Sequence, residues 1–253
     1  MTATKNIHIG TSGWSYKHWR QLYYPEKLPA TKWLNYYAET FHSTEINGSF
    51  YRLPGTETVM KWMQQVPADF LFCPKMSRYL THAKKLREPE EPLERFFGVF
   101  APMQQMLGPV LIQLPHMLAF HAYTADYFFN LIKEKYSAYQ FVLEVRHPSW
   151  LEKESILLLT QYNIGLVISQ SECKFPYSEI VTSNNVYVRF HGPAALYASP
   201  YPDQLLKSYA AKFKRWEKQN CAVWAYFNND IGGYAVEDAK RLMQIVEKRK
   251  SSK

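Results

Sequence analysis

The stretch FVLEVRHPSW at residues 141–150 begins with an apolar segment and continues directly into charged residues and Pro148. The stretches GPVLIQLP (108–115) and NIGLVISQ (163–170) are also short and apolar, and a polar residue stands near the end of each. Strands that are apolar on both faces are typical of a parallel sheet covered by helices. Residues 151–162 lie between two of these strands and have apolar side chains at helical spacing. The local pattern is therefore strand, helix, strand.

The same alternation extends along all 253 residues. We predict strands at 7–13, 43–51, 69–76, 108–115, 140–148, 163–170, 186–192 and 221–230. We predict helices at 32–41, 57–66, 93–107, 124–137, 151–162, 202–219 and 236–250. The connection 171–185 contains Pro176 and polar residues, so its helix is expected to be short, irregular or absent.

Eight strand–helix units in this length predict an α/β fold, a TIM-type (β/α)8 barrel. We expect one domain over 1–253, with the barrel at about 7–242 and a basic C-terminal tail at 243–253. A doubly wound open sheet is the alternative. The turn GTSGW at 10–14 lacks the GxGxxG pattern of a dinucleotide-binding turn, which disfavours that alternative.

The composition is that of a globular protein, with 47% hydrophobic and 21% charged residues. No apolar run approaches the ~20 residues that span a bilayer, and the N-terminal MTATKNIHIG has no signal-peptide pattern. Cys73, Cys173 and Cys221 form no CxxC pair, which predicts neither a disulfide framework nor a zinc ribbon. We therefore expect a reduced, cytoplasmic protein without membrane segments.

The formal net charge is +8, which makes nucleic acid a candidate partner. Half of this charge lies at 241–253, where five basic residues accompany one acid. Residues 207–218 carry five more basic residues and one acid. Both patterns are typical either of a solvated surface or of a phosphate-binding face.

Polar residues stand at the ends of the apolar strands, where TIM-type barrels carry their active sites. Side chains at i and i+2 share a face of a strand, so each pair should point the same way. Together they form a ligand site or a buried polar network that closes the barrel. The pairs are Glu45 with Asn47, Glu144 with Arg146, Arg189 with His191, and Tyr226 with Asn228, and the single residues are Lys75, Gln113 and Asn229.

The cations Lys75, Arg146 and Arg189 favour an anionic ligand such as a phosphate or a carboxylate. Glu144 or His191 would act as general acid or base, and Glu45 as a second carboxylate also permits glycoside chemistry. No HExxH or similar cluster is present, so we predict no metal and no cofactor.

The segment WSYKHWRQLYYP at 14–25 places five aromatic residues and several basic ones directly after the first strand. Such rings stack on bases or sugars, or cap the barrel against one another. Trp14 directly follows the strand and is the residue of this loop that we expect to contact a ligand.

The motifs EINGSFYRLP, FCPKM, EVRHPSW, VRFHG and YFNN resemble those of the domain of unknown function 72 family, also called YecE-like. The resemblance runs from Ile7 to about Leu242. It implies a TIM-type barrel with these motifs gathered at its mouth, and it implies no settled biochemical activity. An acidic residue commonly follows the sixth strand in that family, whereas this chain has Ser169 and Gln170 there.

Three functions stay open at this point. The first is an enzyme, such as a hydrolase, that acts on a phosphate-bearing ligand such as a phosphodiester. The second is a nucleic-acid-binding protein without catalysis, and the third is a carbohydrate-processing enzyme. The sequence determines neither the substrate nor the oligomeric state.

Overall fold

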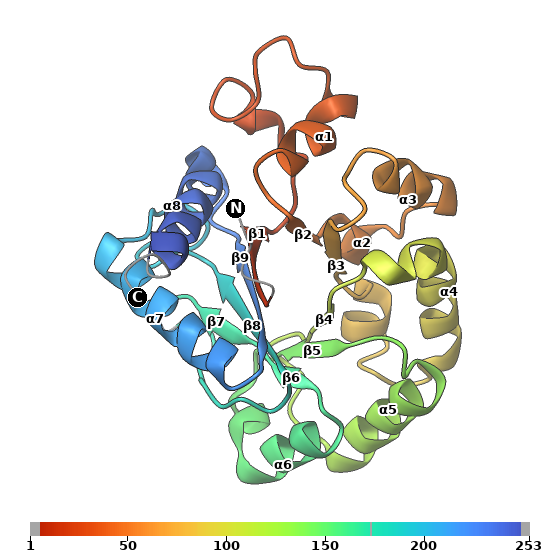
Figure 1. Ribbon diagram of the computed structural model, residues 1–253. Coiled ribbons are helices and arrows are strands. Elements are labelled where there is room, and N and C mark those ends of the chain that lie inside the picture. Colours follow the sequence, from red (N-terminus) through yellow and green to blue (C-terminus); the bar gives the residue numbers. More distant parts are fainter. Residues whose placement is uncertain (1–5, 173, 249–253) are drawn as a thin grey trace.

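The computed structural model describes residues 6–172 and 174–248, and it places parallel strands at the centre with helices around them (Figure 1). The strands are β1 (Ile7–Thr11), β2 (Ser43–Ile46), β3 (Leu71–Pro74), β4 (Val110–Gln113), β5 (Phe141–Glu144), β6 (Gly165–Leu166), β7 (Ile168–Gln170), β8 (Asn185–Phe190) and β9 (Ala222–Phe227). The α-helices are α1 (Trp33–Ala38), α2 (Gly48–Tyr51), α3 (Thr56–Met63), α4 (Glu90–Phe100), α5 (Ala122–Lys135), α6 (Lys153–Gln161), α7 (Asp203–Lys218) and α8 (Tyr234–Lys248).

The strands pair in parallel and form three sheets, in the orders β1-β9-β8-β7, β2-β3 and β4-β5-β6. β6 and β7 are two halves of the predicted strand 163–170, and they pair with β5 and β8 respectively. Isolated bridges, Phe72 to Leu107 and Lys75 to Leu111, connect the region of β3 to that of β4. The α/β class with parallel strands is confirmed. The closed eight-stranded barrel is not confirmed, because the strands form three sheets and not one continuous ladder.

β1 and β2 approach each other through Gly10 and the Thr11–Thr44 contact. A Cβ atom on Gly10 would lie 2.3 Å from the carbonyl oxygen of Ser43, so no larger residue fits there without moving the backbone. Thr44 Oγ1 donates to the carbonyl oxygen of Thr11 at 3.1 Å. This close packing brings Ser12 and Glu45, which follow on these two strands, to the same end of the molecule.

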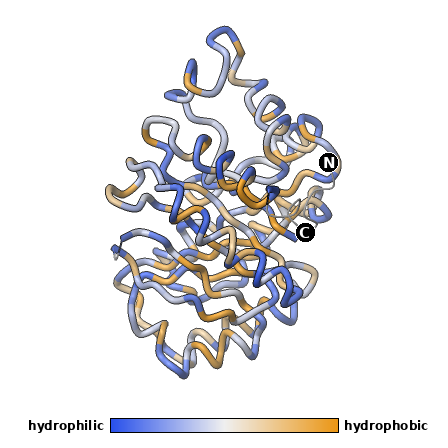
Figure 2. The backbone as a smooth tube through the Cα atoms, turned by 60° about the vertical axis from the view of Figure 1, so that its left-hand side comes forward, coloured by the Kyte–Doolittle hydropathy of each residue, from blue (hydrophilic) through white to orange (hydrophobic). Residues whose placement is uncertain are grey.

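The apolar side chains form two clusters. The smaller consists mainly of strand residues and includes Cys73, Leu111, Tyr187, Trp224 and Tyr226. The larger joins the strands to the surrounding helices. In Figure 2 many segments in the interior of the molecule are orange and many peripheral turns are blue, which is the distribution that burial of apolar surface produces.

Several elements differ from the predicted boundaries, and one connection has no helix among its described residues. The predicted strand 43–51 ends at Ile46, because Asn47 has helical dihedral angles and begins α2. The predicted helix 93–107 ends at Phe100 and continues as the 3-10 turn Ala101–Met106, which contains Pro102. In the connection 171–185, the described residues contain no helix.

The predicted basic tail is only partly visible. Its first residues, 243–248, continue α8, and residues 249–253 lie outside the described residues. Within the described chain, no helix combines the length and the apolar character that crossing a bilayer requires.

Candidate functional site

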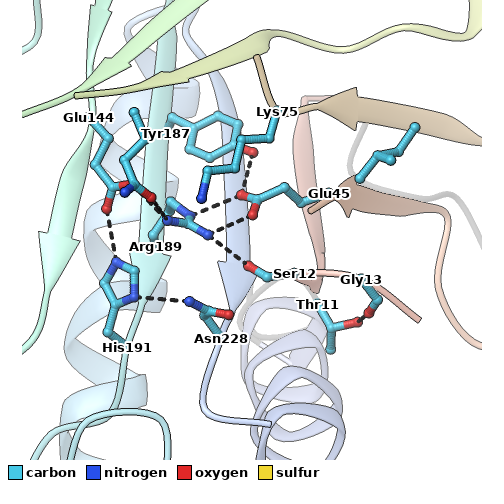
Figure 3. Close-up of polar contacts among 12 residues, drawn as sticks. Thr11, Ser12, Gly13, Glu45, Lys75, Glu144, Tyr187, Arg189, His191 and Asn228 are labelled. Carbon is cyan, nitrogen blue, oxygen red and sulfur yellow. Dashed lines mark hydrogen bonds and ion pairs between the residues drawn. The ribbon is translucent and has the colours of Figure 1, made fainter. Parts of the chain in front are cut away.

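Arg189, near the end of β8, is the centre of a buried charged cluster (Figure 3). Its guanidinium binds Glu45 through two hydrogen bonds, from Nε to Oε2 at 3.0 Å and from Nη2 to Oε1 at 2.7 Å. Nη1 donates to Glu144 Oε2 at 2.7 Å. Arg189 is 1% exposed and both carboxylates are 0% exposed, so the pairing is protected from solvent screening.

Glu144, the last residue of β5, accepts four hydrogen bonds. Its Oε1 atom receives one each from Arg146 Nη2 at 2.7 Å, Ser169 Oγ at 2.8 Å and His191 Nε2 at 2.9 Å. Burial by itself would raise the pKa of Glu144, but the charges of Arg146 and Arg189 and the bond from His191 outweigh burial and hold this pKa well below its usual range. Glu144 is therefore a fixed anion at neutral pH.

His191 follows β8 and is fully buried between Glu144 and Asn228. Asn228 Nδ2 lies 3.2 Å from His191 Nδ1 and can only donate, so Nδ1 accepts and Nε2 carries the proton toward Glu144. Burial lowers the pKa of His191 to about 4, although the hydrogen bond to Glu144 opposes this shift. His191 is thus a neutral imidazole at pH 7 with both nitrogen atoms occupied.

The cluster is electrically balanced. Arg146 and Arg189 supply two positive charges, Glu45 and Glu144 supply two negative ones, and His191 is neutral. Tyr187 adds a neutral hydrogen bond to Glu45 Oε2 at 2.9 Å. A buried ionic network is tolerated when each member is paired in this way.

A cavity of about 840 Å³ lies above this cluster, at the carboxyl ends of the strands. Gly13 and Trp14 follow β1, Asn47 follows β2, and Asn228 follows β9, and all four line it. Arg189 forms part of the floor, whereas Glu45, Glu144 and His191 do not reach the cavity wall. The sequence-predicted site residues therefore divide into a supporting layer and a lining.

The lining is aromatic and basic. Its rings come from Trp14, Tyr16, Phe50, Tyr51, Trp62 and Tyr197. Its basic groups are Lys75, Arg78, His82 and Arg189, and its amides are Asn47, Gln113 and Asn228. Asp230 is the one carboxylate among the described lining residues. The cavity thus offers excess positive charge together with flat apolar surfaces.

Lys75 follows β3 and is 5% exposed. Its Nζ atom lies 4.2 Å from the centre of the Phe50 ring. Burial lowers the pKa of Lys75 to about 7, and the charge of Arg189 acts in the same direction, against the opposing effect of Glu144 and Glu45. Lys75 therefore titrates near neutral pH, in contrast to Glu144 and His191.

Arg146 does not line this cavity. It lines a neighbouring one of about 570 Å³, which shares His82, Gln113 and Tyr197 with the first. Its guanidinium carbon lies 3.3 Å from the centre of the Phe175 ring. The predicted ligand contact of Arg146 would thus lie beside the main cavity, under Phe175.

Asn229 was predicted to contact a ligand, but its side chain points elsewhere. Its Nδ2 atom donates to the carbonyl oxygen of Ser199 at 2.9 Å and to Asp238 Oδ2 at 2.8 Å. Asn229 therefore ties the loop after β8 to α8. Both residues follow the end of β9, and their side chains have different partners, because Asn228 contacts His191 whereas Asn229 contacts Asp238.

The aromatic residues of the loop after β1 divide between the cavity lining and the protein interior. Trp14 and Tyr16 line the cavity, and Trp14 meets Trp62 edge to face at 5.2 Å. Trp19 is fully buried and donates to the carbonyl oxygen of Asp230 at 3.2 Å, and Tyr24 stacks on Trp33 at 4.8 Å.

Several site residues were missed in the sequence. Tyr187 lies two positions before Arg189, on the same face of β8, so strand alternation could have revealed it. Arg78 and His82 follow β3 in a segment that includes the π-helical turn Tyr79–Ala83, a rare feature with no sequence signal. Trp62 reaches the cavity from α3 and Tyr197 from the connection between β8 and α7, and only the tertiary structure shows this.

No arrangement typical of a metal centre occurs in residues 6–172 and 174–248, in which no three or more His, Cys, Asp or Glu side chains converge. The charged cluster consists of two carboxylates already bound to guanidinium groups.

Known proteins resemble this chain over most of its length. It is 27% identical over 210 residues to the UPF0759 protein YecE of Escherichia coli K12, which covers 74% of each chain. It is 23% identical to the UPF0759 protein YunF of Bacillus subtilis over 271 aligned positions and 95% of each chain. A solved DUF72 family protein of Thermotoga maritima superposes with a TM-score of 0.83 at 27% identity, covering 96% of this chain and 99% of that one.

A second solved DUF72 family protein, from Enterococcus faecalis, superposes with a TM-score of 0.82 at 21% identity over 95% of each chain, which shows the likeness of the fold. The family model described as "Protein of unknown function DUF72" matches residues 8–253. Because that match covers almost the entire chain, the protein belongs to the DUF72 family.

Proposed function

We propose that this protein is an enzyme that binds a small anionic, phosphate-bearing ligand in the cavity at the carboxyl ends of its strands. The observation that carries the proposal is the lining. Lys75, Arg78 and Arg189 face the cavity with Asp230 as the one described carboxylate beside them. Aromatic rings complete the wall, as in sites that bind an organic group together with its anion.

Arg189 would receive the anion. Its guanidinium makes five hydrogen bonds. Three of them, to Glu45 and Glu144, are 2.7 to 3.0 Å long and hold it in place, whereas those to Gln113 at 3.4 Å and Ser12 at 3.5 Å are the longer contacts that an anion would replace. A guanidinium fixed in this way loses little conformational entropy when a ligand binds. This supports a preformed anion site.

Glu144 and His191 would hold Arg146, Arg189 and Asn228 in position. The sequence-based hypothesis made either residue the general acid or base. Their hydrogen-bonding atoms are occupied, and neither residue lines the cavity. In this proposal Glu144 and His191 therefore orient the ligand-binding side chains. The group that transfers a proton to or from the ligand would be one of the residues that line the cavity.

The other two hypotheses receive less support from the geometry. Glycoside hydrolysis needs two carboxyl groups that flank the sugar, whereas Glu45 and Glu144 both bind one buried guanidinium. The basic segment 207–218 lies on α7, which contributes no residue to the cavity lining. Charge on α7 would attract nucleic acid without placing it in the cavity.

Calorimetric titration tests the proposal directly. Inorganic phosphate and glycerol 3-phosphate should bind wild-type protein, and neutral glycerol should not. Arg78→Gln, in an exposed residue of the lining, should weaken phosphate binding about tenfold, a typical effect of one charge-assisted contact. Arg215→Gln on the exposed surface of α7 is the matched control and should leave binding unchanged.

Two results would contradict the proposal. One is that glycerol binds as well as glycerol 3-phosphate. The other is that phosphate binds equally well to wild type and Arg78→Gln, while Arg215→Gln weakens the binding.

A further inference from the structure

The side chain of Lys75 lies buried at the edge of a cluster whose charges already cancel. Arg146 and Arg189 balance Glu45 and Glu144. In the part of the chain that the structure describes, the Lys75 amine has neither an ion pair nor a side-chain hydrogen bond, and its contact is the Phe50 ring at 4.2 Å. Figure 3 shows Lys75 extending toward the space beside Arg189, with no dashed contact of its own.

A positive charge on Lys75 would therefore be uncompensated and 95% buried. Burial of an unpaired ammonium costs free energy, and the amine avoids that cost by releasing its proton. The nearby guanidinium of Arg189 adds repulsion. His82 also faces the cavity, but an imidazole is neutral or cationic and so offers Lys75 no counter-charge; burial and the charge of Lys75 lower the pKa of His82. A substantial fraction of the Lys75 amine is consequently neutral at pH 7.

A neutral lysine amine is a nucleophile toward carbonyl carbon. Desolvation and a neighbouring cation are the two features that activate such lysines, and Lys75 has both. Lys75 also lines the cavity, so the amine and a bound ligand share one space. Glu144 and His191 have no comparable access.

We propose that Lys75 is a catalytic amine that forms an imine with an aldehyde or ketone group of the ligand. This inference rests on the proposed function, because the anion binds beside Arg189 and Arg78 and presents the carbonyl to Lys75. The substrate class is a small phosphorylated aldehyde or ketone. The phosphate is the group by which the ligand is held, and the carbonyl is the group that reacts.

The chemistry needs no further reactant. The Nζ lone pair attacks the carbonyl carbon, the C–O π electrons move to oxygen, and the Nζ proton passes to that oxygen to give a carbinolamine. Loss of the hydroxyl group with one further proton releases water and leaves a C=N bond between substrate and Lys75. Bond formation to nitrogen is balanced by cleavage of the C–O bond, and no oxidation or reduction takes place.

Reductive trapping tests the imine. Wild-type protein is incubated with glyceraldehyde 3-phosphate and sodium cyanoborohydride at pH 7, and the modified peptides are identified by mass spectrometry. The expected product is a stable adduct at Lys75, whose mass increase is that of the probe minus one oxygen. Lys75 should react at least about tenfold faster than the exposed lysines, because little of their amine is neutral at this pH.

Lys75→Met is the informative variant, since methionine keeps an unbranched chain of similar length and fits a buried position. The Lys75→Met variant should no longer form the adduct at the rapid rate expected for Lys75. The matched control is Lys61→Met, in an exposed residue of α3 that keeps Lys75 intact and should react like wild type. Glyceraldehyde without phosphate should react more slowly, and inorganic phosphate should compete with the phosphorylated probe.

The rate of trapping at Lys75 should rise with pH through about 7, whereas surface lysines continue to gain reactivity up to their usual pKa near 10. The inference is overturned if Lys75 reacts no faster than the exposed lysines, or if Lys75→Met is modified at the wild-type rate. Phosphate binding by calorimetry separates the two claims. Binding without trapping rejects the imine alone, and loss of both rejects the proposed function as well.

Discussion

Arg189 and Glu45 form a two-point ion pair across the interior, with Nε–Oε2 and Nη2–Oε1 distances of 3.0 and 2.7 Å. They come from β8 and β2, which are 144 residues apart in sequence at these positions. The pair fixes the plane of the guanidinium, and this plane forms part of the cavity floor. The stability of the fold and the shape of the site therefore depend on the same contact.

Removal of the Arg189 charge should strongly destabilise the protein. Arg189→Met leaves the buried carboxylates of Glu45 and Glu144 without their shared partner, which typically costs about 3–5 kcal/mol. Urea denaturation followed by circular dichroism measures the loss. Arg215→Gln, at an exposed position, should stay within about 0.5 kcal/mol of wild type. Equal stability of Arg189→Met and wild type would show that the ion pair contributes nothing.

Glu144→Gln should destabilise the protein instead of selectively removing turnover. Each oxygen of Glu144 accepts hydrogen bonds, so the amide group of glutamine would face donors such as Arg189 Nη1 or His191 Nε2. A loss of about 1–3 kcal/mol is expected for the unmatched donors. The midpoint of thermal unfolding reports it. If the variant keeps wild-type stability but has no activity, the prediction is wrong and Glu144 transfers protons directly.

The stability of the protein should fall as the pH drops from about 6.5 toward 4. Burial lowers the pKa of His191 to about 4, so the folded state favours the neutral imidazole. The stabilisation that this shift provides is complete above pH 6.5, the pKa of histidine in the unfolded chain. It is lost as the pH falls through the pKa of His191 in the folded protein, about 4. The full contribution is about 3 kcal/mol.

His191→Gln serves as the test of this pH dependence, measured by urea denaturation between pH 4 and 8. Glutamine can donate to Glu144 and accept from Asn228, but it does not titrate. The free energy of unfolding of this variant should depend less steeply on pH than that of wild type, and the difference should correspond to the binding of one proton. Some slope should persist, because burial also lowers the pKa of His8 to about 4. Identical slopes in the two proteins would contradict the assignment.

Asn228 and Asn229 should have separable roles. Asn229→Ala removes hydrogen bonds to Ser199 and Asp238 and should cost about 1–3 kcal/mol of stability without weakening phosphate binding. Asn228→Ala removes a cavity-lining amide and the contact to His191, so binding should weaken. Thermal unfolding and calorimetry on both variants decide between these effects. A binding defect confined to Asn229→Ala would reverse the assignment.

Oligonucleotides should bind only through surface charge. The basic residues of α7 contribute nothing to the cavity lining, so fluorescence anisotropy should show binding at low salt that is lost near 0.15 M. The double variant Lys207→Gln/Arg215→Gln should weaken that binding, and Lys75→Met should not. Binding that survives physiological salt and requires Lys75 would place nucleic acid in the cavity.

The sequence by itself determined the order of strands and helices. The segments FVLEV and VLIQL are apolar on both faces. This pattern alone predicts buried parallel strands, whatever the exact positions of the helices that cover them. The same alternation placed Glu144 and Arg146 on one face of β5, and the observed hydrogen bond between them agrees. Local periodicity carries this information because it depends on near neighbours in the chain.

The sequence did not determine which polar residues would face the cavity. Glu144 and His191 have the residue types of an acid and a base, but contacts with Arg189, Ser169 and Asn228 occupy their atoms. Lys75 differs because no carboxylate among the described residues forms an ion pair with its amine, which lies over the Phe50 ring. Burial and pairing arise from elements far apart in the chain. The tertiary structure therefore decided which charged groups pair with one another below the cavity and which amine lines it beside Phe50.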